Sequence, residues 1–190
     1  MSDVTKRALA ASFENVLERK PLDKVTVTDI TDGCGLKRQT FYYHFADIFD
    51  LIKWMYRINS ENAIINHGIK YGTWQQGVRE LIESAHKNRT FIMATYNSKC
   101  RDDLVSYLED VTYQRMLEVI DRMADGSIVA QDREFLAHFY THAFVGTILD
   151  WIKQGMNELP TEIINRLTTL VSMDFDRTIN EFENRNTKQP

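Results

Sequence analysis

The most specific chemistry in this chain lies in one short polar run, residues 37–44. Its first four side chains stand where a recognition helix meets the edges of DNA bases: among them a guanidinium matches guanine, a carboxamide matches adenine, and a methyl packs on thymine. These side chains are Lys37, Arg38, Gln39 and Thr40. The run therefore predicts a segment that reads bases in the major groove.

The neighbouring side chains predict contacts to the DNA backbone. Tyr42, Tyr43 and His44 each carry a hydrogen-bond donor, and such donors bind phosphate oxygens and set the register of a protein on the duplex. Upstream, Thr26 and Thr28 stand where a second helix is expected to begin. The free amides there, together with the Thr26 hydroxyl, are expected to hold another phosphate.

The charge of the chain is distributed in a way that favours this interpretation. The formal net charge is −4, which by itself argues against binding to a polyanion. Residues 36–45, however, contain two cations and no acid, so all 27 Asp and Glu lie elsewhere. Residues 36–45 are therefore a local basic patch.

Three short helices are expected to position the run. The first ends before Pro21, because proline disfavours helix in the residue that precedes it. The second begins with the capping-box pattern of Thr26 and Asp29 and ends at Gly33 and Gly35. The apolar residues expected to face inward are Leu9, Phe13, Val16 and Leu17 in the first helix, Val27, Ile30 and Cys34 in the second, and Leu36, Phe41 and Phe45 in the third.

The remaining sequence predicts further helices and no strands. Apolar residues recur at three- and four-residue steps, and only 3 Pro and 8 Gly are present. After a helix from Asp47 to about Asn66 and a loop over 67–72, we expect helices near 74–88, 90–98, 102–124, 131–155 and 160–185. The fold class is therefore all-α with about nine helices, divided into a helix-turn-helix domain (1–46) and a C-terminal helical domain (47–190).

The helix at 131–155 is apolar on most of its circumference and is expected to be buried on several sides. Ala143 and Gly146 would permit close helix contact, while Gly155 closes this helix and Pro160 starts the next. The apolar breadth of these last two helices fits either an intramolecular bundle or an interface between protomers.

Composition excludes several classes of protein. The two cysteines form neither a disulfide framework nor a paired metal motif, and the chain opens with polar residues rather than a signal sequence. No stretch approaches the roughly 18 consecutive apolar residues of a membrane span. We expect a cytoplasmic protein that is not associated with a membrane.

The segment from Thr26 to Ile30, followed by residues 35–45, resembles the DNA-binding domain of the TetR family of regulators over roughly residues 3–55. The resemblance implies a homodimer, joined through the last two helices (about 131–185), on a roughly palindromic double-stranded operator. It also implies control by a small-molecule effector or a partner bound to the C-terminal domain. Where the family usually has a lysine after the helix-closing Phe, this sequence reads Ala46-Asp47-Ile48, and Lys37 stands at the expected N-cap of the recognition helix.

Other residues resemble a subgroup that includes regulators of dihydroxyacetone kinase operons. They are the run from Lys37 to Tyr42, the segment Tyr71-Gly72-x-Trp74 and the segment Trp151-Ile152-Lys153-x-Gly155. Because this subgroup includes activators, the sign of regulation stays open. An alternative function is a protein-controlled activator of such an operon with no small-molecule pocket.

Aromatic and histidine side chains of the C-terminal part are candidates for a ligand pocket, although each alone is more often plain core. The candidates are Trp54, Phe91, Tyr96, Tyr107, Tyr113, His138 and His142. His138 and His142 lie one helical turn apart, but no glutamate completes a His-Glu-x-x-His motif, so we predict no metal and no cofactor.

Two other classes of function compete with a DNA-binding regulator. An enzyme is disfavoured because no nucleophile-base pair, glycine-rich phosphate loop or metal signature occurs at useful spacing. A protein-interaction module with the same fold, acting through another protein, stays open. A DNA-binding regulator is the leading prediction.

Overall fold

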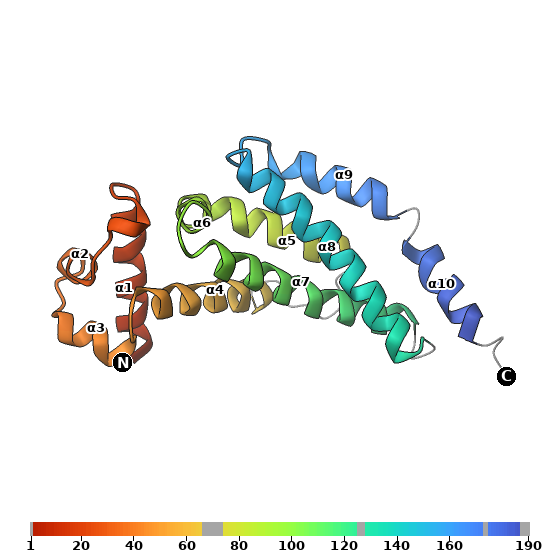
Figure 1. The fold of residues 1–190 in the computed structure, drawn as a ribbon, viewed down its shortest axis with the longest axis horizontal. Helices are drawn as coiled ribbons and strands as arrows, with labels where there is room; N and C mark the ends of the chain where they lie inside the picture. The colour runs from red at the N-terminus through yellow and green to blue at the C-terminus, as the bar shows by residue number, and fades with distance from the viewer. Residues whose placement is uncertain (1, 66–73, 125–127, 173–174, 187–190) are drawn as a thin grey trace. The chain divides into compact units, whose positions relative to one another are not determined.

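The computed structural model describes residues 2–65, 74–124, 128–172 and 175–186, and all regular secondary structure in these ranges is helical (Figure 1). The prediction of an all-α fold is confirmed. The α-helices are α1 (Ser2–Leu17), α2 (Val27–Gly33), α3 (Arg38–His44), α4 (Ile48–Ile65), α5 (Trp74–Lys87), α6 (Arg89–Tyr96), α7 (Arg101–Ala124), α8 (Ala130–Lys153), α9 (Pro160–Ser172) and α10 (Phe175–Asn186), with a short 3-10 helix η1 at Leu22–Lys24.

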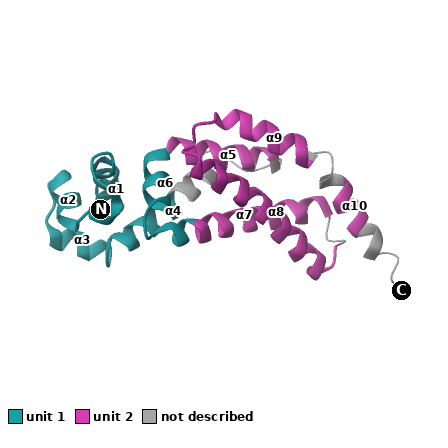
Figure 2. Ribbon diagram, turned by 45° about the horizontal axis from the view of Figure 1, so that its top comes forward, with its two compact units in different colours: residues 1–67, 88–104 teal, residues 68–87, 105–190 magenta. Residues whose placement is uncertain are grey.

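The chain divides into two compact units (Figure 2). Unit 1 comprises residues 1–67 and 88–104, and unit 2 comprises residues 68–87 and 105–190. The domain boundary predicted after residue 46 falls between α3 and α4, which both lie in unit 1. The helix-turn-helix therefore shares a compact unit with α4 and α6.

Aromatic rings form the core of unit 1. Phe91 of α6 is 2% exposed, and its ring lies 6.3 Å from that of Phe13 in α1 and 5.1 Å from that of Tyr56 in α4. Leu9 and Phe13 are fully buried on α1, which packs against α2, α3 and α6. The first helix thus supports the two helices of the DNA-binding motif.

The turn between α2 and α3 depends on a glycine in the left-handed region. Gly35 has a φ of +68°. Its amide donates to the Asp32 carbonyl (3.3 Å), and the next amide, of Leu36, donates to the Thr31 carbonyl (2.9 Å). This pair of bonds is a Schellman motif, which ends a helix and reverses the chain. The predicted glycine turn is therefore confirmed.

The α1 and α2 backbones approach closely at Gly33. The Ser12 hydroxyl, which is buried, donates a 2.6 Å hydrogen bond to the Ile30 carbonyl. A Cβ atom added at Gly33 would lie 2.3 Å from Ser12 Oγ. A larger residue there must break this bond or separate the helices.

Gly33→Ala is therefore expected to destabilise the protein by about 1–3 kcal/mol, because the buried carbonyl of Ile30 loses its partner or the helices shift. The matched control is Gly33→Ala in a Ser12→Ala background, where the Oγ atom that the new Cβ would meet is absent. In that background the substitution should cost much less, because the Ile30 carbonyl has already lost its partner. Urea unfolding monitored by circular dichroism measures both, and an equal cost in the two backgrounds would contradict the close approach.

Unit 2 is held together by helix pairs. The apolar residues Ile163, Ile164 and Leu167 are buried on α9, which packs against α5. Arg133 of α8 forms an ion pair with Asp121 of α7, with Nη2 2.6 Å from Oδ2. At the end of α8, Gly155 has a φ of +82°, and α9 begins at Pro160 as predicted.

Several details differ from the sequence predictions. The helix expected at 160–185 is two helices, α9 and α10, so the described residues contain ten α-helices rather than nine. The apolar residues on both sides keep a helical spacing, so the sequence pattern could not separate them. In the second helix, Val27 and Cys34 are only half-buried. The loop expected at 67–72 lies outside the described residues.

The prediction that the 131–155 helix is buried on several sides is wrong within this chain. Phe135 and Phe139 of α8 are 61% and 59% exposed, and Ala143 and Gly146 are also exposed. Among the described residues, the buried side chains of α8 lie on one face of the helix. None of the described helices has the length and apolar character needed to cross a membrane.

Candidate nucleic-acid interface

Helix α3 begins without a side-chain cap. Lys37 is the N-cap residue, as predicted, and its side chain makes no capping hydrogen bond. A cation at this end opposes the helix dipole, at a cost of about 0.3–1 kcal/mol. The Thr40 amide donates to the Lys37 carbonyl at 2.8 Å and closes the first turn. The Lys37 side chain is exposed at the start of the helix.

Two phenylalanines anchor the inner face of α3. Phe41 is fully buried and Phe45 is 2% exposed, and their ring centroids are 5.7 Å apart. The Phe45 ring also lies 5.7 Å from that of Trp54 in α4. Lys6 Nζ of α1 lies 5.3 Å from the centre of the Phe45 ring and 5.9 Å from that of Trp54. These contacts fix the orientation of α3 within unit 1.

The outer face of α3 carries most of the predicted DNA-binding side chains. Lys37, Arg38 and Gln39 are exposed, whereas Thr40 and His44 are half-buried. Tyr42 and Tyr43 are 51% and 83% exposed.

Two of the outer side chains contact each other one helical turn apart. Arg38 Nη2 donates to the Tyr42 hydroxyl at 3.5 Å. The predicted base-reading residue and a predicted phosphate-binding residue are therefore neighbours on one surface.

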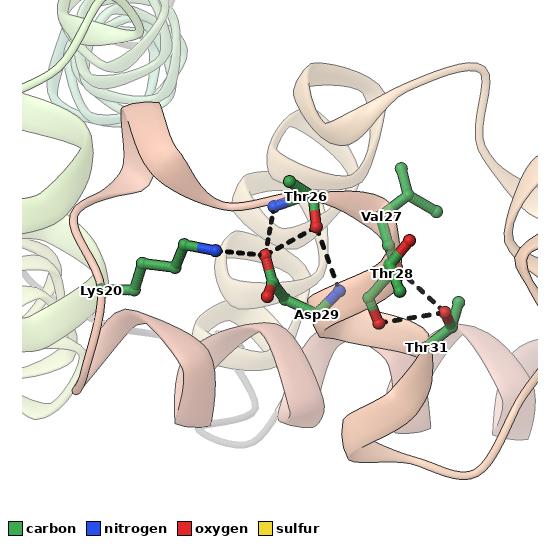
Figure 3. Close-up of polar contacts among 6 residues, drawn as sticks. All are labelled: Lys20, Thr26, Val27, Thr28, Asp29 and Thr31. Carbon is green, nitrogen blue, oxygen red and sulfur yellow. Dashed lines mark hydrogen bonds and ion pairs between the residues drawn. The ribbon is translucent and has the colours of Figure 1, made fainter.

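The N-terminus of α2 contains the predicted capping box (Figure 3). Thr26 Oγ1 accepts from the Asp29 amide at 3.2 Å and donates to Asp29 Oδ2 at 2.6 Å. The same carboxylate oxygen accepts from the Thr26 amide and from Lys20 Nζ, each at 2.7 Å. The hydrogen bond from Lys20, with those from Thr26, lowers the pKa of Asp29 to about 2. The hydroxyl and amide of Thr26 are thus both used within the cap, while Thr28 is exposed beside it.

Sequence reasoning missed a second cap, at the start of α4. Asp50 Oδ2 accepts from the Ala46 amide at 3.0 Å, and Asp47 Oδ1 accepts from the Asp50 amide at 2.8 Å. The signal was the spacing Asp47-x-x-Asp50, which is that of a capping box. The sequence thus places two helix-capping carboxylates directly after α3, where the resembled family usually has a lysine.

The predicted pocket residues lie in two different units. In unit 1, Trp54 and Phe91 are buried in the aromatic core, and the Tyr96 hydroxyl accepts from Arg101 Nη2 at 3.2 Å. In unit 2, Tyr107 and Tyr113 of α7 are half-buried. The pocket assignment stays a prediction for all of these residues.

The two histidines of unit 2 are exposed on α8. The His138 ring is stacked on Tyr113 with a centroid distance of 4.5 Å. His142 Nδ1 lies 2.7 Å from the His138 carbonyl. Within the described part of the chain, no three His, Cys, Asp or Glu side chains gather as they would around a metal ion.

Comparison with known families gives two matches. Residues 9–53 match "Bacterial regulatory proteins, tetR family", and residues 72–173, more than half of the chain, match the TetR-type "Transcriptional regulator C-terminal region". The chain belongs to the TetR family. A TetR-family protein is a DNA-binding transcription regulator, so the predicted class of function is confirmed.

Individual relatives of this TetR-family chain are also regulators. It is 20% identical over 178 residues to the HTH-type dhaKLM operon transcriptional activator DhaS of Lactococcus lactis subsp. lactis, covering 90% of this chain and 93% of the relative. A solved structure of the dihydroxyacetone kinase operon activator DhaS aligns with a TM-score of 0.72 at 19% identity, covering 90% of this chain and 97% of that one. The regulator EthR of Mycobacterium tuberculosis is 42% identical over 43 residues, which are 23% of this chain and 20% of EthR.

Proposed function

We propose that this chain acts as a homodimer that binds a roughly palindromic operator with one α3 helix from each protomer. The observation that carries the proposal is the exposed triplet Lys37, Arg38 and Gln39 on a helix anchored by buried Phe41. Two-fold symmetry would place the two recognition helices about 34 Å apart, one turn of DNA. In this role the protein acts in the cytoplasm and catalyses no reaction.

The side chains of α3 divide into base contacts and backbone contacts. Arg38 is suited to guanine and Gln39 to adenine through bidentate hydrogen bonds, and the Thr40 methyl to thymine. Phosphate contacts are assigned to Lys37 and to the hydrogen-bond donors around the base-reading residues. Thr26 contributes indirectly, because it holds the α2 cap in place. The phosphate-contacting residues in this proposal are Lys37, Tyr42, Tyr43, His44 and Thr28.

Arg38→Ala is expected to relax the preference for one base pair in each half-site by about 1–3 kcal/mol, roughly 5- to 150-fold, because one bidentate contact is lost. Tyr42→Phe should instead weaken binding by a similar factor on every sequence, because a phosphate contact carries no sequence information. Selection of bound duplexes from random DNA, followed by titration at fixed salt, separates the two effects.

Arg19→Ala is the matched control, since Arg19 is exposed on unit 1 outside α3. It should leave both the selected sequence and the affinity near those of the unmodified protein. Identical selected sequences for the unmodified protein and Arg38→Ala would contradict the base-reading role.

The dimer is proposed to form through α8 and the helices that follow it. Phe135, Phe139, Ala143 and Gly146 repeat every three or four residues, so they form one exposed stripe along α8. Leu170 on α9 is 72% exposed. Large exposed apolar residues gathered on one face mark protein interfaces, and nothing within 4 Å of a Gly146 Cβ obstructs a partner helix.

Control of DNA binding is assigned to the C-terminal domain. A small molecule or a partner protein bound there can change operator affinity only if it favours one of two arrangements of the chain. We propose that α4 is the helix that differs between the two arrangements, since α4 follows the DNA-binding motif directly in the sequence.

The full-length similarity to DhaS favours a second candidate function. In that candidate the chain is an activator of a dihydroxyacetone kinase-like operon that is controlled by another protein and has no small-molecule pocket. Deleting the chain's gene would then lower transcription of the adjacent operon, and a partner protein would co-purify with the regulator. Raised transcription after deletion would exclude this candidate.

A further inference from the structure

Two histidines lie on the exposed side of α8, where the proposed dimer forms. His138 and His142 are both exposed and lie one helical turn apart, with ring centroids separated by 6.2 Å. His142 stands three residues after Phe139 and four before Gly146, so it lies within the exposed apolar stripe. It is also at the middle of α8, which spans Ala130–Lys153. An ionisable ring therefore occupies the centre of an otherwise apolar stripe.

The hydrogen bond of His142 determines which of its ring nitrogens can bind a metal ion. Nδ1 lies 2.7 Å from the His138 carbonyl, and because a carbonyl only accepts, Nδ1 carries the proton. In the neutral ring the lone pair is then on Nε2, and no described residue donates a hydrogen bond to it. Histidines that bind metals usually donate their other ring N–H to a carbonyl or carboxylate in this way, which fixes the tautomer.

The two rings are close enough to share one ion. The His138 ring is stacked on Tyr113 of α7 at a centroid distance of 4.5 Å, which restricts its position. Two imidazoles bound to one Zn²⁺ at about 2.0–2.1 Å have their centroids roughly 5 Å apart. The observed 6.2 Å between His138 and His142 therefore requires only a small rotation of two exposed side chains.

One chain supplies only part of the ligand set of a metal ion. The prediction of no metal from the sequence treats a single chain, and within the described ranges no third His, Cys, Asp or Glu side chain joins the pair. Neutral imidazole suits Zn²⁺, whereas Mg²⁺ and Ca²⁺ prefer oxygen ligands. Structural Zn²⁺ is almost always bound by four ligands in a tetrahedron. A second copy of the same histidine pair would supply the missing ligands.

We propose that His138 and His142 of both protomers form a Zn²⁺ site in the dimer interface, with one ion bound by four imidazoles. Two-fold symmetry places the same residues of each protomer in one interface, so the middle of the stripe meets its own copy. Formation of the dimer would remove the free Nε2 of His142 from water, which is unfavourable unless that atom gains a partner. The ion supplies this partner. The proposal rests on the proposed function, in which α8 forms the dimer that binds the operator.

The test is a titration of the metal-free, full-length protein with ZnCl₂. Calorimetry is expected to give one Zn²⁺ per dimer. Sedimentation velocity over a series of protein concentrations measures the dimer dissociation constant without and with the ion. At a free Zn²⁺ concentration about ten times the dissociation constant of the site, the dimer dissociation constant should fall about 10-fold, because the ion binds the dimer much more tightly than the monomer. MgCl₂ at the same concentration should have no effect.

His138→Ala and His142→Ala each remove two of the four ligands from the dimer, so the change caused by Zn²⁺ should fall below about 2-fold. The constants with and without Zn²⁺ are compared within each variant, so any effect of the substitution on the metal-free dimer cancels. Glu134→Gln is the matched control, because Glu134 is exposed on α8 one turn before His138 and is not grouped with the histidines. This control should keep the full change of about 10-fold.

The proposal is overturned if Zn²⁺ leaves the dimer dissociation constant unchanged, including the case in which one ion binds to each chain separately. It is also overturned if both alanine variants keep the full change. Operator selection is carried out on the same samples, in EDTA and in Zn²⁺. A dimer that selects an operator but does not respond to Zn²⁺ would remove only this site, whereas a Zn²⁺-linked dimer that selects no duplex would remove the proposed function.

Discussion

A Phe139→Glu variant is expected to be monomeric at concentrations where the unmodified protein is a dimer. Phe139 is 59% exposed in the middle of the α8 stripe, and the two-fold axis of the proposed dimer brings the change into the interface twice. Burying two carboxylates without partners should cost at least roughly 3 kcal/mol, which is more than about 100-fold in the dimer dissociation constant. Operator affinity should fall with it, because a monomer engages one half-site only.

Sedimentation velocity measures the association state, and circular dichroism checks that the variant is folded. Val129→Glu is the control: Val129 is 49% exposed at the N-cap of α8 and lies outside the stripe. This control should remain dimeric and bind the operator normally. A dimeric Phe139→Glu variant would place the interface elsewhere on the molecule.

Phe41→Ala is expected to destabilise the protein by about 3–5 kcal/mol, the usual effect of deleting a fully buried phenylalanine from a core. Phe41 is 0% exposed and its ring touches those of Tyr42 and Phe45. Since α3 is only seven residues long, its orientation depends on this anchor rather than on its own helical stability. Operator binding should therefore weaken as well.

The control for this prediction lies two residues away. Tyr43 is 83% exposed, so Tyr43→Ala removes an aromatic ring from the same helix and should change stability by no more than about 0.5 kcal/mol. Urea unfolding of both variants gives the comparison. Equal unfolding midpoints for the two would show that α3 is not held by its inner face.

Local patterns in the sequence predicted the DNA-binding motif accurately. The capping box at Thr26 and Asp29, the glycine turn at Gly35 and the N-cap position of Lys37 each depend on residues a few positions apart. Their geometry follows from nearest-neighbour sterics and hydrogen bonding. The family resemblance added the biological role.

The errors concern properties that depend on distant parts of the chain or on other chains. Helical periodicity placed Phe135 and Phe139 among the apolar positions of one helix. It could not show that their own chain leaves them exposed. The candidate pocket, which includes Trp54 of unit 1 and Tyr113 of unit 2, stays a prediction, since single-sequence reasoning has no measure of which helices pack into one unit. The cap formed by Asp47 and Asp50, in contrast, is a local feature that the spacing Asp47-x-x-Asp50 indicates.

The ion pair between Lys20 and Asp29 has a consequence for the electrostatics of the operator complex. With a pKa of about 2, the Asp29 carboxylate stays ionised at physiological pH, and it lies at the helix end proposed to approach a phosphate. Lys20, 2.7 Å away, cancels this charge locally. Lys20 thus reduces the repulsion between the Asp29 carboxylate and the DNA phosphates without itself contacting the duplex.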